Sequence, residues 1–259
     1  MNRSAAHISL SVWQALFLRE ALSRIVSGRA AWFWLLAEPV LHVGYMVLLF
    51  TVFRVTKIGG VDVAVWVMVG MLAFFSFRRT GTQVGNAISA NRSLFTYRQV
   101  KPVDAALVRG GLEGFLMVLV TLVLLVGMGL FGHDILPDDP LAVMGAFAAL
   151  WLLGLGFGLT TSVVGHLVPE IDRVLSFVMM PLYLISGVMV PLASFPLPQR
   201  EWLMLNPIAH GIEAVRLGFA PYYHAPPELS LPYLYTSALV IVFLGLALHR
   251  RFALRLLTQ

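Results

Sequence analysis

Six long apolar stretches recur along the chain of 259 residues, separated by segments that carry polar and charged side chains. The stretches cover residues 31–53, 61–77, 112–131, 141–165, 174–192 and 231–249. An α-helix needs roughly 20 apolar residues to cross the hydrocarbon core of a bilayer, and the second stretch is the shortest of the six. Because a lone strand would leave its backbone groups unpaired in lipid, the pattern predicts six transmembrane α-helices.

The segment before the first stretch, residues 4–29, is too polar to cross a membrane but has a helical pattern of its own. One arc of such a helix collects the apolar side chains Leu10, Phe17, Leu18, Ala21, Leu22 and Ile25. The opposite arc collects Ser9, Glu20, Ser23 and Ser27. This division predicts an amphipathic helix that lies in the membrane interface and leads into the first span. A solvent-exposed tail is the alternative.

The segment between the fifth and sixth stretches, residues 193–230, is long for a connecting loop. Its prolines prevent it from crossing the membrane twice, yet "EWLMLNPIAHGIEAVRLGF" is apolar with helical spacing. Two short re-entrant helices that dip into the outer leaflet fit this pattern, provided that protein buries their ends. A plain folded loop is the alternative.

Composition supports an all-α integral membrane protein in a single domain, residues 1–259. The chain is 59% hydrophobic and 12% charged, with a mean hydropathy of +0.84. If both termini lie in the cytoplasm, all but four of the 18 Lys and Arg residues lie on the cytoplasmic side. The four exceptions are Arg54, Lys57, Arg200 and Arg216. Cations collect in cytoplasmic loops of membrane proteins, so the net charge of +5 indicates orientation and does not imply nucleic acid.

The sequence lacks the motifs of several enzyme classes. It has no GxxxxGK[ST] loop for nucleotide phosphates, no HExxH zinc motif and no GxSxG nucleophile turn. His210 and Glu213 are three residues apart on a possible helix, but that spacing favours a structural hydrogen bond or a lipid-headgroup contact over a metal site. We therefore expect no catalytic residues, no metal and no cofactor in this chain.

The first span carries polar side chains that lipid does not suit. Trp34, Glu38, His42 and Tyr45 fall on one face of a helix, and a charge buried in lipid costs roughly 2.5–3.5 kcal/mol. This face is predicted to line a water-filled translocation path or to contact another helix. A structural salt bridge from Glu38 to a nearby arginine is the alternative.

Three stretches together resemble one known family. "ANRSLFTYRQVKPVDAALVRGGLE" is similar to the first cytoplasmic loop of the permeases of type-2 ABC exporters, and most of all to the capsular polysaccharide exporter permeases. "SRIVSGRAAWFWLLAEPVLH" resembles that family's approach to the first span. "SGVMVPLASFPLPQREWLMLNPIAHGIEAVRLGF" resembles its segment after span five. The similarity covers nearly the whole chain.

This resemblance implies the transport subunit of an ATP-driven exporter. It implies a homodimer of six-span subunits in the bacterial inner membrane, with two separate ATPase subunits that hold ATP and Mg. The expected cargo is a lipid-linked, usually acidic polysaccharide, and a periplasmic co-polymerase-type adaptor is a further expected partner. The alternatives are a permease for another lipid-linked polymer or a drug, a non-conducting membrane assembly protein, and an ion-coupled transporter, which is disfavoured because no inverted repeat is evident.

Residues 88–104 are expected to form a short cytoplasmic helix that docks on the ATPase. Asn91 or Ser93 suits its N-cap, and Pro102 suits its end. The segment offers apolar anchors and charge, namely Leu94, Phe95, Tyr97, Arg98 and Lys101.

On the opposite side, five residues of the 193–230 segment are expected to flank the exit or contact the periplasmic partner. They are Trp202, Asn206, His210, Glu213 and Arg216.

Overall fold

The computed structural model describes residues 5–26, 31–97, 99–168 and 170–258, and these are mostly helical. In chain order the elements are α1 (Ala5–Val26), α2 (Ala31–Val52), β1 (Lys57–Ile58), β2 (Val61–Asp62), α3 (Val63–Gly85), α4 (Ala87–Ala90), the 3₁₀ helix η1 (Arg92–Thr96), α5 (Pro102–Leu130), α6 (Pro140–Leu167), α7 (Ile171–Ile185), the 3₁₀ helix η2 (Leu192–Ser194), α8 (Gln199–Leu203), α9 (Pro207–Phe219), α10 (Leu231–Arg251) and α11 (Arg255–Thr258). The two short strands pair antiparallel.

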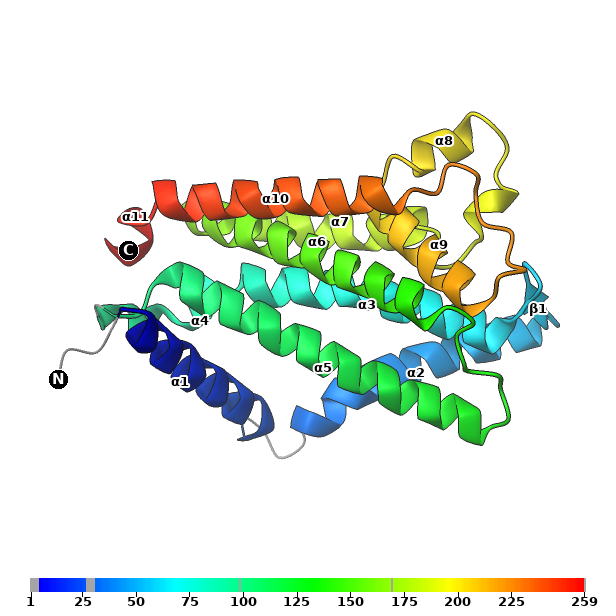
Figure 1. Cartoon of the computed structure of the whole chain (residues 1–259), viewed down its shortest axis with the longest axis horizontal. Helices are drawn as coiled ribbons and strands as arrows, with labels where there is room; N and C mark the ends of the chain where they lie inside the picture. The colour runs from blue at the N-terminus through cyan, green and yellow to red at the C-terminus, as the bar shows by residue number, and fades with distance from the viewer. Residues whose placement is uncertain (1–4, 27–30, 98, 169, 259) are drawn as a thin grey trace.

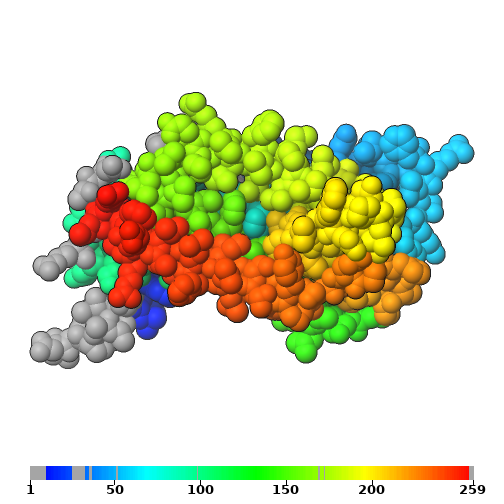
Figure 2. Space-filling model, turned by 90° about the horizontal axis from the view of Figure 1, so that it is seen from above, coloured from blue at the N-terminus to red at the C-terminus, as the bar shows by residue number. Residues whose placement is uncertain are grey.

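The long helices run side by side and separate two ends of the molecule (Figure 1). One end holds α1, α4, η1 and α11, and we call it the terminal end because both chain termini lie there. The other holds the β1–β2 hairpin, α8 and α9, and we call it the hairpin end. In the space-filling view, the segment around α8 (yellow) and the hairpin region (light blue) form the surface of the hairpin end (Figure 2).

Each of the six predicted spans corresponds to a helix, namely α2, α3, α5, α6, α7 and α10. Among the described residues, α3, α5, α6 and α10 are long and apolar enough to cross a membrane. The apolar helical parts of α2 and α7, Ala37–Phe50 and Arg173–Ile185, are shorter. The helical, multi-pass architecture is thus confirmed with four candidate spans, and a count of six stays a prediction.

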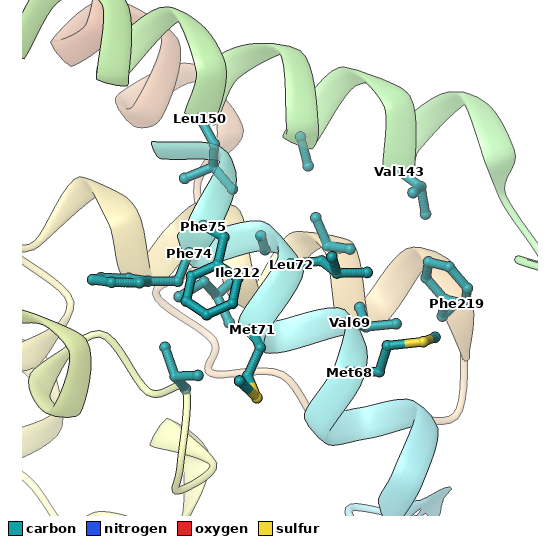
Figure 3. Close-up of a cluster of buried hydrophobic side chains, with 14 of the residues drawn as sticks. Met68, Val69, Met71, Leu72, Phe74, Phe75, Val143, Leu150, Ile212 and Phe219 are labelled. Carbon is teal, nitrogen blue, oxygen red and sulfur yellow. The ribbon is translucent and has the colours of Figure 1, made fainter. Parts of the chain in front are cut away.

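Helix α3 forms the centre of the fold. Nearly all of its residues from Val63 to Phe77 are buried, and it packs against α5, α6 and α9. Figure 3 shows its Met68 and Leu72 among side chains of the neighbouring helices, including Leu150 of α6 and Ile212 of α9. A helix buried on every side explains why this span shows no polar face in the sequence.

Small residues bring α6 close to its neighbours. A Cβ at Gly154 would lie 2.5 Å from the backbone oxygen of Phe77, and one at Gly158 would lie 2.7 Å from that of Gly81. On another side of α6, a Cβ at Gly156 would lie 2.6 Å from the backbone nitrogen of Val242 in α10. The glycines of "GLGFGLTTSVVG" therefore serve helix packing, as small residues commonly do between membrane helices.

Helix α1 covers most of the segment predicted to be amphipathic, and one residue of the predicted polar arc, Ser23, is exposed. The helix packs against α5 and α2. Glu20 is buried, whereas Leu10, Leu18 and Leu22 of the apolar arc are exposed. An apolar arc that points away from the protein suits a helix lying in the membrane interface.

The predicted helix over 88–104 is wrong in its shape. The chain forms the last turn of α4, then η1, and then an extended residue, Lys101, with φ −99° and ψ 146°. Pro102 begins α5 instead of ending a helix. Proline fits the first turn of a helix because its missing N–H would have no partner there, and it pushes the preceding residue to extended backbone.

Candidate functional site

A network of ion pairs joins four helices near the terminal end. Glu20 of α1 and Glu113 of α5 are both buried. Arg109 Nε donates to Glu20 Oε1 at 2.6 Å, and Arg24 pairs with Glu113. Because burying a charge is costly unless it is paired and hydrogen-bonded, these contacts of Glu20 and Arg24 bind α1 to the bundle. Hydrophobic patterning alone could not reveal this network.

Helix α2 joins the same network through Glu38. Its Oε2 lies 3.8 Å from Arg79 Nη1 of α3, and Arg79 Nε lies 3.8 Å from Glu113 Oε2. The salt bridge weighed as the alternative role of Glu38 is therefore present. The side chain of Glu38 is also 54% exposed, so the carboxylate remains accessible.

The four predicted path residues on α2 divide into two groups. Trp34 and Tyr45 are 60% and 58% exposed. His42 instead packs edge-on against Phe75 of α3, with ring centroids 5.6 Å apart, and against Tyr183 of α7 at 6.0 Å. The face thus combines exposed aromatic rings with a partly covered imidazole.

Arg78, which the sequence indicated only as one of the cytoplasmic-side cations, lies beside this face. Arg78 of α3 is partly exposed, and its Cζ lies 5.8 Å from the centroid of the Phe75 ring. His42 packs on the same Phe75 ring, so the packing of the helices brings Arg78 and His42 to one ring. No spacing rule along the sequence predicts that arrangement.

The expected coupling residues line an apolar cavity at the terminal end. A cavity of about 480 Å³ is lined by Phe95, Tyr97, Lys101 and Pro102 together with residues of the last turns of α10. Tyr97 is 65% exposed, whereas Phe95 packs against the buried cluster of Ile88, Val163 and Leu256. Arg98 lies outside the described residues.

Neither expected N-cap residue caps a helix with its side chain. Asn91 precedes η1 but makes no side-chain cap bond. It accepts a hydrogen bond from Arg19 of α1 and donates to Ala87 O at 2.9 Å. Ser93 lies within η1. Leu94, the remaining anchor, is partly buried.

At the hairpin end, Arg216 and Glu213 form a buried ion pair at 3.2 Å. The Arg216 guanidinium stacks over the Trp66 ring at 3.5 Å. Tyr223 Oη donates to Glu213 Oε2 at 2.8 Å, and burial raises the pKa of Tyr223, so its hydroxyl stays protonated as a donor. The pair therefore holds the fold together and is out of reach of a partner.

His210 and Asn206 are also engaged in internal hydrogen bonds. His210 is buried between Met204 O, 2.7 Å from Nε2, and Ser230 N, which donates to Nδ1 at 3.0 Å. Asn206 Oδ1 caps α9 by accepting from Ile208 N at 3.1 Å. Of the five expected exit residues only Trp202, 69% exposed, presents its side chain to a partner. The described residues hold no group of three metal-ligating side chains.

Comparisons with known proteins agree on one family. The ABC-2 type transporter family matches residues 11–220. The chain is 33% identical to the "Polysialic acid transport protein KpsM" of Escherichia coli over 250 residues, which cover 96% of each chain. It is 28% identical to the "Capsule polysaccharide export inner-membrane protein CtrC" of Neisseria meningitidis over 92% of this chain and 90% of the relative. The corresponding protein BexB of Haemophilus influenzae is 25% identical over 93% of this chain and 91% of the relative.

Proposed function

Because the chain belongs to the ABC-2 type transporter family, we propose that it is the membrane subunit of an ATP-driven exporter of capsular polysaccharide. The cargo is a lipid-linked polymer that this subunit passes across the bacterial inner membrane. The observation that carries the proposal is the near full-length match to relatives named for capsule polysaccharide export and polysialic acid transport.

The energy for transport comes from a separate ATPase, since the chain has no phosphate-binding loop of its own. The ATPase docks at the terminal end, on the 88–104 segment. Its docking site includes the exposed Tyr97 and the apolar cavity beside Lys101. A rigid-body movement of the ATPase is transmitted through η1 into α5, which begins directly after this segment.

The transporter is a homodimer of six-span subunits with two ATPase subunits. The exposed faces of α2 and α7 support this arrangement. Each displays large apolar side chains, including Leu41 and Leu48 of α2 and Phe177 and Met180 of α7. The path for the polymer runs between the two copies, along the α2 face with Trp34 and Tyr45. Aromatic rings pack against the C–H faces of sugars without fixing one sugar in place, which suits a moving polymer.

The hairpin end is periplasmic in this proposal, and the η2–α9 segment dips into the outer leaflet. The burial of α9 among α3, α6 and α10 supports it, because a re-entrant helix needs protein around its ends. The exposed α8, with Trp202, is the part that a periplasmic adaptor contacts.

The test is genetic and biochemical. Deletion of the gene in its own bacterium is expected to abolish surface polysaccharide and leave the polymer inside the cell, and the wild-type chain is expected to restore export. An affinity tag on the chain is expected to retain an ATPase subunit through detergent extraction. Unchanged surface polysaccharide in the deletion strain would refute the export role, and a chain that retains no ATPase would favour an assembly protein.

A further inference from the structure

Two adjacent arginines of α3 have opposite electrostatic surroundings. Arg79 lies 3.8 Å from a carboxylate oxygen of Glu38 and 3.8 Å from one of Glu113. Among the Asp and Glu side chains that the structure describes, none has an oxygen within 4.0 Å of the Arg78 guanidinium. Arg78 thus has no carboxylate partner among these described side chains, directly beside an arginine that has two.

Arg78 lies beside a group of aromatic rings from three helices. Its Cζ is 5.8 Å from the Phe75 ring, and His42 of α2 packs on both Phe75 and Tyr183 of α7. The Phe75 ring therefore contacts both the guanidinium and the imidazole. Arg78, His42 and Tyr183 are all partly exposed, so a ligand can reach them, whereas Phe75 is buried beneath them.

This grouping has the chemistry of an anion site. A guanidinium presents its N–H donors in a planar fork that fits carboxylate and phosphate oxygens. The imidazole of His42 adds a polar group near it, and the ring faces of His42 and Tyr183 suit a sugar. The Tyr183 hydroxyl donates to Met189 Sδ at 3.4 Å, and sulfur is a weak acceptor that an anion's oxygen can replace. An ionisable side chain on a membrane helix marks a candidate functional site by default.

We propose that Arg78, His42 and Tyr183 form a site for a negatively charged group of the exported polymer, either a sugar carboxylate or the phosphate of its lipid carrier. The proposal rests on the export function above and names the chemistry that its path recognises. It also accounts for Glu38. Arg79 offsets the charge of that carboxylate, so an acidic polymer can pass α2 without meeting an uncompensated negative charge.

The binding test uses the full chain with its ATPase subunits in nanodiscs of phosphatidylcholine, and the readout is the ligand-induced shift in thermal unfolding. Three probes are compared, namely a soluble oligosialic acid, phosphatidylglycerol added to the nanodisc, and a neutral dextran oligomer. The variants are Arg78→Gln, Arg78→Lys and Tyr183→Phe. The matched control is Arg173→Gln, which removes an exposed cation from α7.

Loss of a charge-assisted hydrogen bond is expected to weaken binding roughly ten- to a hundredfold in Arg78→Gln. Arg78→Lys and Tyr183→Phe are expected to lose less, and Arg173→Gln to bind like the wild type. A loss confined to oligosialic acid assigns the site to the sugar carboxylate, and a loss confined to phosphatidylglycerol assigns it to the carrier phosphate. The proposal is overturned if Arg78→Gln binds both anions as tightly as the wild type does. It is also overturned if Arg78→Gln dissociates the dimer, because that result would mean that Arg78 pairs with a carboxylate of the second copy.

An export assay separates this proposal from the proposed function. In the deletion strain, Arg78→Gln is expected to lower surface polysaccharide about tenfold relative to the wild type, at equal abundance of the chain. Normal export by Arg78→Gln overturns the anion site and leaves the export function intact. Failure of the wild-type chain to restore export would instead refute the function itself.

Discussion

At the scale of single residues, Arg216 shows how the chain keeps a full charge in its interior. Its guanidinium donates to Gly187 O at 2.7 Å and to Val188 O at 2.9 Å. It also pairs with Glu213 at 3.2 Å. One side chain thus neutralises a buried carboxylate and fixes the turn that follows α7.

Arg216→Ala is expected to destabilise the chain by about 3–5 kcal/mol, because it leaves Glu213 as an uncompensated buried charge. The measurement is thermal unfolding in detergent, followed by the yield of folded protein. Arg173→Ala is the control, since Arg173 is exposed, and its effect is expected to stay within roughly 0.5 kcal/mol. Similar unfolding of both variants would contradict the structural role given to the pair.

A second residue-scale prediction concerns pH. Arg200 donates to both carboxylate oxygens of Glu228 and links α8 to the segment before α10. This hydrogen bonding lowers the pKa of Glu228 below its ordinary value of 4.5. A carboxyl with a lower pKa in the folded state stabilises that state above the unfolded pKa, and the contribution is lost as the pH falls through the folded pKa.

We therefore expect the amides of α8 to exchange hydrogen more slowly in wild type than in Glu228→Gln at pH 6. The difference is expected to vanish as the pH falls through the lowered pKa of Glu228, where the wild-type carboxylate becomes protonated. Hydrogen exchange of wild type and Glu228→Gln at matched pH measures this difference in the exchange of the α8 amides. Equal exchange at every pH would show that the ion pair does not hold α8.

At the scale of elements, the contact between α3 and α6 depends on glycine. Gly154→Ala would place a Cβ 2.5 Å from the backbone oxygen of Phe77, and neither helix backbone can give way locally. The expected loss is about 1–3 kcal/mol of stability. Gly127→Ala on α5 is the control, because its Cβ would meet nothing within 4 Å. Thermal unfolding of Gly154→Ala and Gly127→Ala is compared. Equal unfolding temperatures would mean that α6 shifts to accommodate the added Cβ without loss of stability.

The coupling segment gives the second element-scale prediction. Tyr97→Asp is expected to detach the ATPase, because an unpaired charge in an apolar groove costs a few kcal/mol. Phe95→Asp is a poorer test, since Phe95 packs inside the chain itself. Tyr222→Asp, similarly exposed but beside Gly60 of the β1–β2 turn, is the control. Co-purification and export measure the effect, and normal values for both variants would place the docking site elsewhere.

At the scale of the whole molecule, the order of the helices was predictable and their ends were not. Apolar runs mark helices that contact lipid or core, so the six stretches matched helices in sequence. Helix α3 continues to Gly85 because protein covers Thr80 and Val84, and hydropathy does not register that cover. For the same reason hydropathy does not indicate that Glu20 pairs with Arg109.

The candidate site was predictable to a smaller degree. The α2 face was identified from its helical spacing, and the salt bridge of Glu38 was one of two roles considered. Arg78 and Tyr183 were missed, because their meeting with His42 depends on how α2, α3 and α7 pack. A structural hydrogen bond was one of the roles considered for His210 and Glu213. The burial of Arg216 was missed, because a charged residue in an apolar segment has the same sequence pattern whether it faces a partner or a counter-charge.

The chain termini and the coupling segment lie at the same end of the molecule (Figure 1). A topology experiment can therefore use the complete chain. The sequence contains no cysteine, so single cysteines introduced at exposed positions report on one site each. Ser93→Cys lies at the terminal end, and Asp138→Cys lies in the exposed turn between α5 and α6. The excess of cations around the first and the aspartates around the second predict that they lie on opposite sides of the membrane.

A membrane-impermeant thiol reagent is therefore expected to label Asp138→Cys in cells whose outer membrane alone has been permeabilised. Ser93→Cys is expected to react only after the inner membrane is opened. Full reaction of both after opening is the control for exposure, and normal export confirms that each variant is folded. Labelling of Ser93→Cys from the periplasm would place the 88–104 segment away from any cytoplasmic ATPase, and the coupling proposed for η1 and α5 would fail with it.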